Sequence, residues 1–258
     1  MAKKNKKQKE LKKIEKHQRV NDILLGPLER PAIAWLVKVM PAWVTPDHLT
    51  FLGFFSAVLI GLSYWLTNFD ARYLWLANLG FLINWFGDSL DGSLARYRKI
   101  ERPKYGFFID HTVDTISEVS IFMGLGLSPY IDFELGLIAL VGYLCMASLV
   151  YITTSVKGEF KISYGSLGPT EARVIAMIAN TVIFFIGNPA IKLPIGEFSL
   201  YKLVLIAVIF LLFFFFFYTT TTTAIELERE DRKNWIKKAK KSKVKKPKGK
   251  KRKNNLPS

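Results

Sequence analysis

The sequence predicts an all-α integral membrane protein with six transmembrane helices and an N-terminal interfacial helix. Three observations support this fold class. The chain has 258 residues, 50% of them hydrophobic, and most of residues 47–225 is apolar in long runs. Short segments rich in Pro, Gly, Asn and Asp separate these runs. Lys and Arg gather in alternate connections and near both ends of the chain, as they do in membrane proteins.

Composition divides the chain into four parts. Residues 1–20 are a basic N-terminal tail, residues 21–46 a juxtamembrane segment and residues 47–225 the membrane domain. Residues 226–258 form a basic cytoplasmic tail that we expect to be disordered. Anionic lipid is one partner for the basic tails, at about 1 kcal/mol per Lys or Arg near the surface. A solvated tail without a partner is equally compatible, and nucleic acid is less favoured.

The juxtamembrane segment is apolar, but Pro27, Pro31 and Pro41 interrupt it. The pattern predicts an interfacial helix near residues 30–40, with Trp35 and Trp43 at the level of the lipid headgroups. A simple connector is the alternative.

Six segments are apolar enough to cross a bilayer, which takes about 20 residues each. Acidic residues occupy the second and third segments, so the apolar pattern does not define where these two spans end. The predicted spans are residues 47–67, 73–95, 106–127, 134–156, 172–188 and 199–224.

Positive charge predicts the orientation of these spans. Residues 1–46 carry 11 Lys and Arg, residues 96–104 carry 5, residues 157–173 carry 3 and the tail from residue 226 carries 15. The opposite connections hold only Arg72, Lys192 and Lys202. Basic residues favour the cytoplasmic side, so a multi-pass protein with both termini in the cytoplasm is expected.

Four aspartates lie at the cytoplasmic ends of the second and third spans. Asp88 and Asp91 are three residues apart, and Asp110 and Asp114 are four apart, so each pair shares one face of a helix. The short link between the spans makes the two helices antiparallel neighbours. The four carboxylates are therefore predicted to converge on one pocket at the cytoplasmic membrane surface.

Such a cluster needs compensation, because a charge in mid-membrane costs about 2.5–3.5 kcal/mol on insertion scales. Oxygen-only ligands suit Mg²⁺ or Mn²⁺, and two ions roughly 4 Å apart can clamp the attacking and leaving oxygens of a phosphoryl transfer. Two alternatives are a buried ion-pair network with nearby Arg and Lys, and the ion path of a membrane cation transporter. Transporters usually bind their ions near the bilayer midplane at repeat interfaces, and the sequence has no evident repeat.

Small residues and an arginine surround the aspartates. Gly92 and Gly106 let a phosphate approach the backbone, Ala95 keeps the same face shallow, and Arg96 can pair with a phosphate. Together with the aspartates they fill the pattern D-x-x-D-G-x-x-A-R, nine residues, G-x-x-x-D-x-x-x-D. This pattern, with six spans, resembles the CDP-alcohol phosphotransferase family over residues 45–225. The first span opens with "TPDHLT", which is similar to the family's entry to that helix.

The resemblance implies roles for these residues. Metal ligands would be Asp88, Asp91 and Asp110, and Asp114 would be the general base and a ligand of the second ion. Donor-binding residues would be Asp47, Thr50, Gly92, Ala95, Arg96 and Gly106. In one respect the chain departs from the pattern: many relatives carry Ser or Thr three residues before the motif glycine, whereas this chain has Pro103.

The predicted cytoplasmic connection 157–173 offers an acceptor site. Lys157, Lys161 and Arg173 lie on the same side as the metal pocket and could bind an acceptor phosphate. Setting the membrane topology is an equally weighted role for them. Arg173 is the preferred candidate, because a charge at the start of the fifth span needs a reason.

The resemblance implies a membrane phosphatidyltransferase of phospholipid synthesis. It would move a phosphatidyl group from CDP-diacylglycerol to the hydroxyl of a small polar alcohol, such as inositol phosphate or glycerol phosphate, and release CMP. A CDP-aminoalcohol:diacylglycerol phosphotransferase is the alternative within the family. The resemblance also implies a homodimer.

Overall fold

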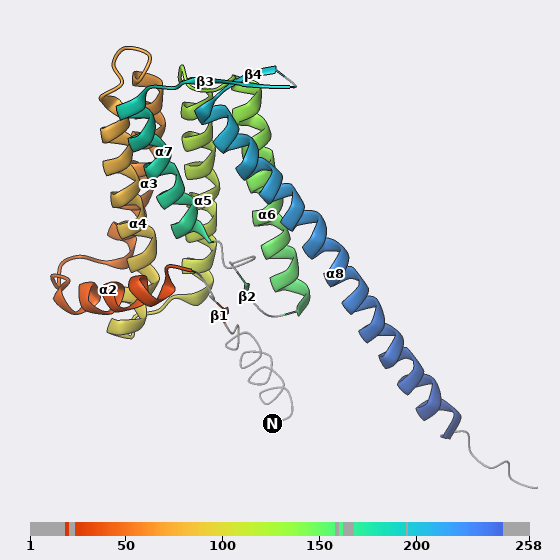
Figure 1. The fold of residues 1–258 in the computed structure, drawn as a ribbon. Coiled ribbons are helices and arrows are strands. Elements are labelled where there is room, and N and C mark those ends of the chain that lie inside the picture. Colours follow the sequence, from red (N-terminus) through yellow and green to blue (C-terminus); the bar gives the residue numbers. More distant parts are fainter. Residues whose placement is uncertain (1–18, 21–23, 158–159, 162–167, 195, 245–258) are drawn as a thin grey trace, which may run out of the picture. The chain divides into compact units, whose positions relative to one another are not determined.

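The computed structural model describes residues 19–20, 24–157, 160–161, 168–194 and 196–244. Within α8 the chain divides into two compact units, Met1–Phe216 and Phe217–Ser258. The helices are α2 (Gly26–Val39), α3 (Pro46–Leu66), α4 (Tyr73–Arg98), α5 (Pro103–Gly126), α6 (Phe133–Lys157), α7 (Pro169–Ile186) and α8 (Leu200–Val244) (Figure 1). The strands are β1 (Arg19–Val20), β2 (Phe160–Lys161), β3 (Ala190–Leu193) and β4 (Gly196–Ser199).

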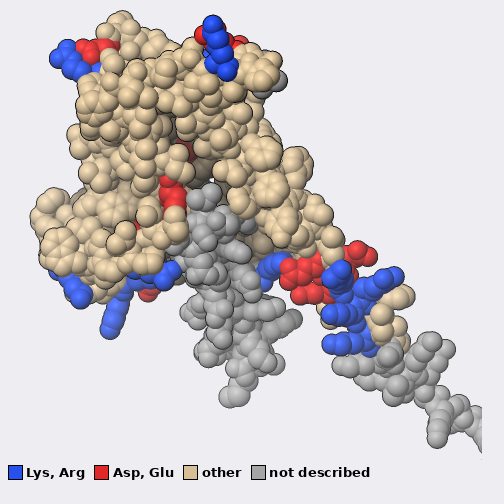
Figure 2. All heavy atoms as spheres, viewed as in Figure 1, with Lys and Arg blue, Asp and Glu red and all other residues tan. Residues whose placement is uncertain are grey.

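Helices occupy all six segments that the sequence predicts to span the membrane. Four described helices, α3, α6, α7 and α8, are long and apolar enough to do so by length and composition. The charged residues that α4 and α5 carry lower their hydropathy. On the face of the first unit that Figure 2 shows, Lys and Arg lie at the two ends and uncharged residues cover most of the surface between them.

The sequence predicted an all-α protein, and the structure also has the short strands β1 to β4. The two residues of β1 pair in parallel with β2, and β3 pairs with β4 as an antiparallel hairpin between α7 and α8. Gly187 and Gly196 have positive φ angles of 73° and 141°, which L side chains rarely adopt, and they mark the entry to β3 and the start of β4.

The interfacial helix predicted near residues 30–40 is α2, which begins earlier, at Gly26. Pro27 lies at its start, where a missing N–H costs nothing, and Pro31 one turn later is tolerated inside the helix. One side of α2, which includes Val37, packs against Leu90 and Leu94 of α4. In Figure 1, α2 runs across the ends of α3 and α4 rather than alongside them.

Close helix contacts hold α3, α4 and α5 together. A Cβ atom on Gly87 of α4 would lie 2.6 Å from the backbone N of Gly53 in α3. A Cβ atom on Gly124 of α5 would lie 2.2 Å from the carbonyl oxygen of Gly61 in α3. In both places the backbones approach so closely that only glycine fits, as in membrane helices packed through small residues.

At the end of the bundle near the β3–β4 hairpin, a buried polar network joins four helices. The hydroxyl groups of Tyr64 in α3 and Tyr201 in α8 donate to Asn180 Oδ1, at 3.1 and 2.8 Å. Asn180 of α7 donates to Asn78 Oδ1 of α4 at 2.9 Å. Fully paired polar groups of this kind hold helices together where lipid offers no partner.

Helix α8 is longer than the predicted span 199–224. It continues to Val244, through the first part of the segment that we expected to be disordered. Good helix formers explain the continuation, since Glu, Lys, Arg and Ala dominate residues 224–244 and Glu228 precedes Arg232 by four residues. Residues 1–18 and 245–258, which hold most of the basic tails, lie outside the described residues.

The contact between α3 and α5 can be tested by Gly124→Ala. The added methyl group must push the two helices apart, and overpacking of this kind costs about 1–3 kcal/mol. We expect a clear loss of thermal stability, measured as Tm of the purified protein in nanodiscs. Gly142→Ala is the matched control, because its Cβ atom would meet Phe213 at an ordinary 3.4 Å. An equal Tm for both variants would contradict the close contact.

Candidate functional site

The first half of the site is on α4. Asp88 and Asp91 lie one turn apart, and Asp91 is 9% exposed. The hydroxyl of Thr50 on α3 donates to Asp91 Oδ2 at 2.7 Å, so α3 orients this carboxylate. Helix α4 ends in a C-cap at Lys99 with a left-handed φ of 58°. After this sharp turn the chain enters α5.

The second half of the site is on α5, which begins at Pro103. Proline in the first turn suits a helix start, so the residue that departs from the family pattern has a structural role here. Asp110 and Asp114 follow one turn apart, with His111 between them. Its Nδ1 lies 3.8 Å from Asp110 Oδ2 and 3.7 Å from Asp114 Oδ2. The centre of the imidazole ring lies 4.2 Å from that of Phe107, in an edge-on contact, and 5.0 Å from that of Tyr151 on α6, in a tilted contact.

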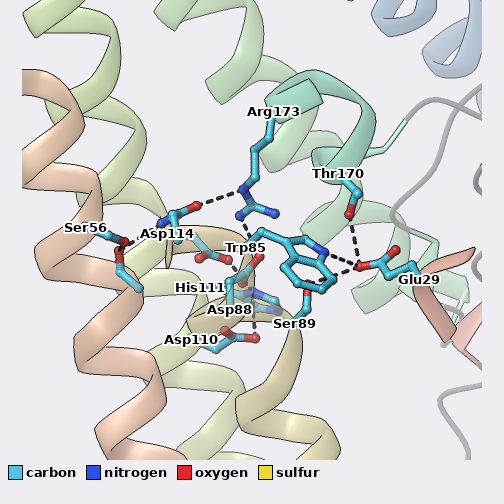
Figure 3. A network of polar contacts seen from close by, with 12 residues as sticks. Glu29, Ser56, Trp85, Asp88, Ser89, Asp110, His111, Asp114, Thr170 and Arg173 are labelled. Carbon is cyan, nitrogen blue, oxygen red and sulfur yellow. Dashed lines mark hydrogen bonds and ion pairs between the residues drawn. The ribbon is translucent and has the colours of Figure 1, made fainter. Parts of the chain in front are cut away.

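The four aspartates line one small cavity between α3, α4 and α5. Its lining comprises Thr50, Gly53, Phe54, Asn84, Asp88, Asp91, Asp110, Val113, Asp114 and Ser117. Figure 3 shows Asp88 of α4 facing Asp110 and Asp114 of α5. The structure therefore confirms the prediction that the four carboxylates converge on one pocket.

This donor set fits a divalent cation. One ligand atom each from Asp110, His111 and Asp114 lies within 4.8 Å of the others, and the carboxylates of α4 face them across the cavity. Carboxylate oxygens are the ligands that Mg²⁺ and Mn²⁺ prefer. Four acids around one cavity also repel one another unless positive charge lies between them.

Arg173 of α7 supplies one positive charge. Its Nη2 donates to Asp88 Oδ2 at 2.6 Å and its Nε donates to Asn84 Oδ1 at 2.8 Å (Figure 3). The arginine side chain is 13% exposed. Asn84 in turn donates to the carbonyl oxygen of Gly53 at 2.8 Å, so it bridges α3, α4 and α7. An ion pair between the aspartates and a basic residue, one of the alternatives from the sequence, thus exists beside the cavity.

Of the six predicted donor-binding residues, Thr50 lines the cavity and the other five are not part of its lining. Asp47 forms an exposed ion pair with Arg102, whose guanidinium also lies 4.3 Å over the ring of Tyr105. Arg96 is exposed and donates to Ser93 Oγ at 3.0 Å. Space is open at Gly106, where an added Cβ would meet no atom within 4 Å.

Among the predicted donor residues, Gly92 and Thr50 have contacts that differ from those expected. An added Cβ on Gly92 would meet the side chain of Arg96 at 3.2 Å, so this arginine covers the glycine. Ala95, next to Arg96, is half-buried. Thr50 bonds to a motif aspartate, a contact that the sequence did not predict.

Of the three predicted acceptor residues, the structure brings Arg173 to the aspartates. Lys157 is the last residue of α6. Lys161 lies on β2, and its side chain is outside the described part of the chain. The acceptor role of both lysines stays a prediction.

Sequence reasoning assigned neither Asn84 nor His111 to the site. A signal for Asn84 was present, because it lies four residues before Asp88 on the face that carries both α4 aspartates. A signal for His111 was also present, because it directly follows Asp110 and precedes Asp114 by three residues on one helix. Its other neighbour, Tyr151, comes from a distant helix.

Known proteins resemble this chain over the same region. Residues 43–227 match the family model for CDP-alcohol phosphatidyltransferase. An archaetidylinositol phosphate synthase from Pyrococcus horikoshii is 30% identical over 138 residues, which cover 53% of this chain and 69% of the relative. A phosphatidylinositol phosphate synthase from Cutibacterium acnes is 37% identical over 90 residues, 34% of this chain and 41% of the relative.

Two further likenesses were found. Human cholinephosphotransferase 1 is 26% identical over 192 residues, which cover 69% of this chain but only 46% of that enzyme. A crystal structure of Mycobacterium tuberculosis phosphatidylinositol phosphate synthase with CDP-DAG bound shares 22% identity at a TM-score of 0.47, over 74% of this chain and 89% of that one.

Thr50→Val tests whether the threonine orients Asp91. The loss of a bond to a metal-binding carboxylate typically lowers metal affinity about 10- to 100-fold. We expect a loss in that range for Mn²⁺, measured by electron paramagnetic resonance, with Tm unchanged. Thr50→Ser keeps the hydroxyl and is the control. A Thr50→Val protein with parental Mn²⁺ affinity and a raised KM for the CDP-linked donor would instead place Thr50 against the nucleotide.

Proposed function

Because the chain belongs to the CDP-alcohol phosphatidyltransferase family, we propose that it transfers a phosphatidyl group from CDP-diacylglycerol to the hydroxyl of a small polar alcohol and releases CMP. The convergence of four aspartates from α4 and α5 on one cavity supports this proposal most directly. The likeness to two inositol phosphate lipid synthases favours a phosphorylated polyol as the acceptor. The cation-transporter alternative is set aside, because this is an enzyme family.

Each group in the site has a role in this reaction. Asp88, Asp91, Asp110 and Asp114 would hold two Mg²⁺ or Mn²⁺ ions, which when bound neutralise the donor's diphosphate and the charge that develops on the reacting oxygens. Asp114 takes the proton of the acceptor hydroxyl as the oxygen attacks phosphorus, and the bond to CMP breaks. Thr50 and Asn84 keep α3 and α7 against the α4 carboxylates during transfer.

The donor side of the proposed site is the surface made by Asp47, Gly92, Ala95, Arg96 and Gly106. The space at Gly106 and the exposed guanidinium of Arg96 suit the approach of a diphosphate. Arg173 suits the acceptor side. An arginine has five N–H donors, and bonds to Asn84 and Asp88 engage two of them, so the guanidinium can still contact a phosphate.

In the proposed membrane arrangement, α3 to α8 provide six spans and α2 lies in the interface. The exposed apolar side chains of α2 and the loop after it support this placement, because Leu28, Trp35 and Trp43 are 63–74% exposed. The distribution of Lys and Arg supports a cytoplasmic location for the aspartate end of the bundle. Pairing of two chains in the membrane stays a prediction.

A second candidate function is the transfer of a phosphoalcohol from a CDP-aminoalcohol to diacylglycerol. The match to cholinephosphotransferase 1 favours it, since it covers more of this chain than either synthase match does. The aspartate motif serves both reactions.

One assay tests the proposal. Purified protein in nanodiscs receives Mg²⁺ or Mn²⁺, labelled CDP-diacylglycerol and a panel of alcohols with and without phosphate, and CMP release is measured. Labelled CDP-choline with diacylglycerol forms the second arm. CMP release in the CDP-diacylglycerol arm but not in the CDP-choline arm supports the phosphatidyltransferase. Release in the CDP-choline arm but not in the CDP-diacylglycerol arm supports the second candidate. Absence of CMP in every arm would contradict both.

Asp114→Asn tests the assignment of the general base. Loss of a positioned base typically slows turnover about 10²- to 10⁴-fold. We expect kcat to fall in this range while Mn²⁺ affinity falls much less, measured on the same preparation. Asp91→Asn is the contrast, because it should lose metal affinity and kcat together. Equal losses in both variants would reassign Asp114 as a metal ligand only.

Arg173→Gln tests the acceptor side. The variant removes the charge that would bind an acceptor phosphate, so the preference for phosphorylated over unphosphorylated alcohols should fall. A charge-assisted hydrogen bond contributes about 1.5–3 kcal/mol, which corresponds to roughly 10- to 150-fold in that preference. The measurement is the ratio of kcat/KM for inositol phosphate and inositol. An unchanged ratio would leave Arg173 as only the partner of Asp88.

A further inference from the structure

Glu29 of the α2 helix connects three helices next to the aspartate site. Its Oε1 accepts hydrogen bonds from Trp85 Nε1 at 3.0 Å, from Ser89 Oγ at 3.1 Å and from Thr170 Oγ1 at 3.1 Å. Figure 3 shows the carboxylate between these donors. Trp85 and Ser89 lie on α4 and Thr170 lies in the first turn of α7, so one oxygen ties α2 to both.

The three donors are neighbours of site residues. Trp85 and Ser89 are four residues apart on α4 and each directly follows a partner of Arg173, Asn84 and Asp88. On α7, Thr170 precedes Arg173 by one turn. The junction of α4 and α7 thus has two polar ties side by side, one through Arg173 and one through Glu29. Since the second tie does not involve the aspartates, it can hold the junction whatever occupies the cavity.

A second carboxylate anchors α2 to α7. Glu171 is 4% exposed, and its Oε1 accepts the backbone N–H of Leu25 at 2.8 Å while its Oε2 accepts that of Gly168 at 2.8 Å. The start of α2 is therefore fixed to the start of α7, and Val37 near the end of α2 packs on Leu90 and Leu94 of α4. Glu29 lies between these two anchors.

From these contacts we propose that Glu29 is a positioning residue, which sets α7 against α4 and so places Arg173 relative to the aspartates. The effect on acceptor binding rests on the proposed function. The three donors are neutral, so the junction needs an acceptor oxygen in the right place and not a negative charge. A glutamine in the same rotamer supplies that oxygen, whereas alanine removes it.

The catalytic test compares Glu29→Ala, Glu29→Gln and the parent in nanodiscs with CDP-diacylglycerol and inositol phosphate. Misplacement of a binding group by about 1 Å can cost as much as 100-fold, so we expect at least a 10-fold higher KM for inositol phosphate in Glu29→Ala. The KM for CDP-diacylglycerol should change less than twofold. Glu29→Gln should restore parental values. Glu134→Ala, an exposed acid in the first turn of α6, is the control.

A structural readout is independent of catalysis. Spin labels at Leu82→Cys on α4 and Ile178→Cys on α7, both exposed, report the distance between these helices in a Cys145→Ser background. The distribution should broaden or shift in Glu29→Ala and match the parent in Glu29→Gln. Thr170→Val removes only the α7 donor and should give a smaller change of the same kind, which covers the case that Glu29→Ala does not fold.

The outcomes separate the two proposals. Altered distances in Glu29→Ala, with no CMP from any donor in the parent, would support the positioning role and reject the proposed function. Parental distances and KM values in Glu29→Ala would overturn the positioning role. Equal defects in Glu29→Ala and Glu29→Gln would also overturn it, because they would show that the charge matters and not the placement of the oxygen.

Discussion

Mutual repulsion among four carboxylates around one small cavity is the constraint on which this site depends. Asp88, Asp91, Asp110 and Asp114 cannot all stay ionised in a poorly solvated space without positive charge and hydrogen-bond donors nearby. The chain supplies a hydroxyl from α3 and a guanidinium from α7, and in the proposed function divalent cations would supply the remainder. Each of these compensating groups comes from a different helix, so the electrostatics of the site require a particular packing of the whole bundle.

Glycine makes that packing possible. The backbones of α3 and α4 approach closely at Gly53 and Gly87, and those of α3 and α5 at Gly61 and Gly124, in the bundle where the α4 carboxylates face α5. The first contact is next to the site, since a Cβ on Gly53 would meet the backbone N of Asp88 at 3.5 Å. Close approach here shortens the path from Thr50 to Asp91 to a single hydrogen bond. Small residues in these helices are thus as much a part of the site as the acids they support.

The sequence predicted the aspartates of the site better than it predicted the residues that hold them in place. Charge at regular helical spacing, together with a short link, was enough to place Asp88 and Asp91 opposite Asp110 and Asp114, because helix periodicity and antiparallel pairing are local properties. The contacts of Asn84 and Glu29, and the packing of His111 on Tyr151, were not predictable in this way. Each depends on which face of a distant helix is presented, as when Thr170 meets Glu29 from 141 residues away. The hairpin of β3 and β4 was missed for another reason: its strands of four residues each carry too weak a pattern.

Helix α2 holds none of the motif residues, but it contacts both helices that carry Asp88 and Arg173. Its apolar side covers the back of α4 at Leu90 and Leu94, the residues that flank Asp91 and Ala95. Exposed tryptophans on and just after α2 suit the bilayer surface, so the same helix would touch both lipid and the motif helix. A reaction between a lipid donor in the bilayer and a polar acceptor in water needs the donor side and the acceptor side of the site to be aligned at this interface. A helix lying across the bundle and bonded to both α4 and α7 is well placed to maintain that alignment.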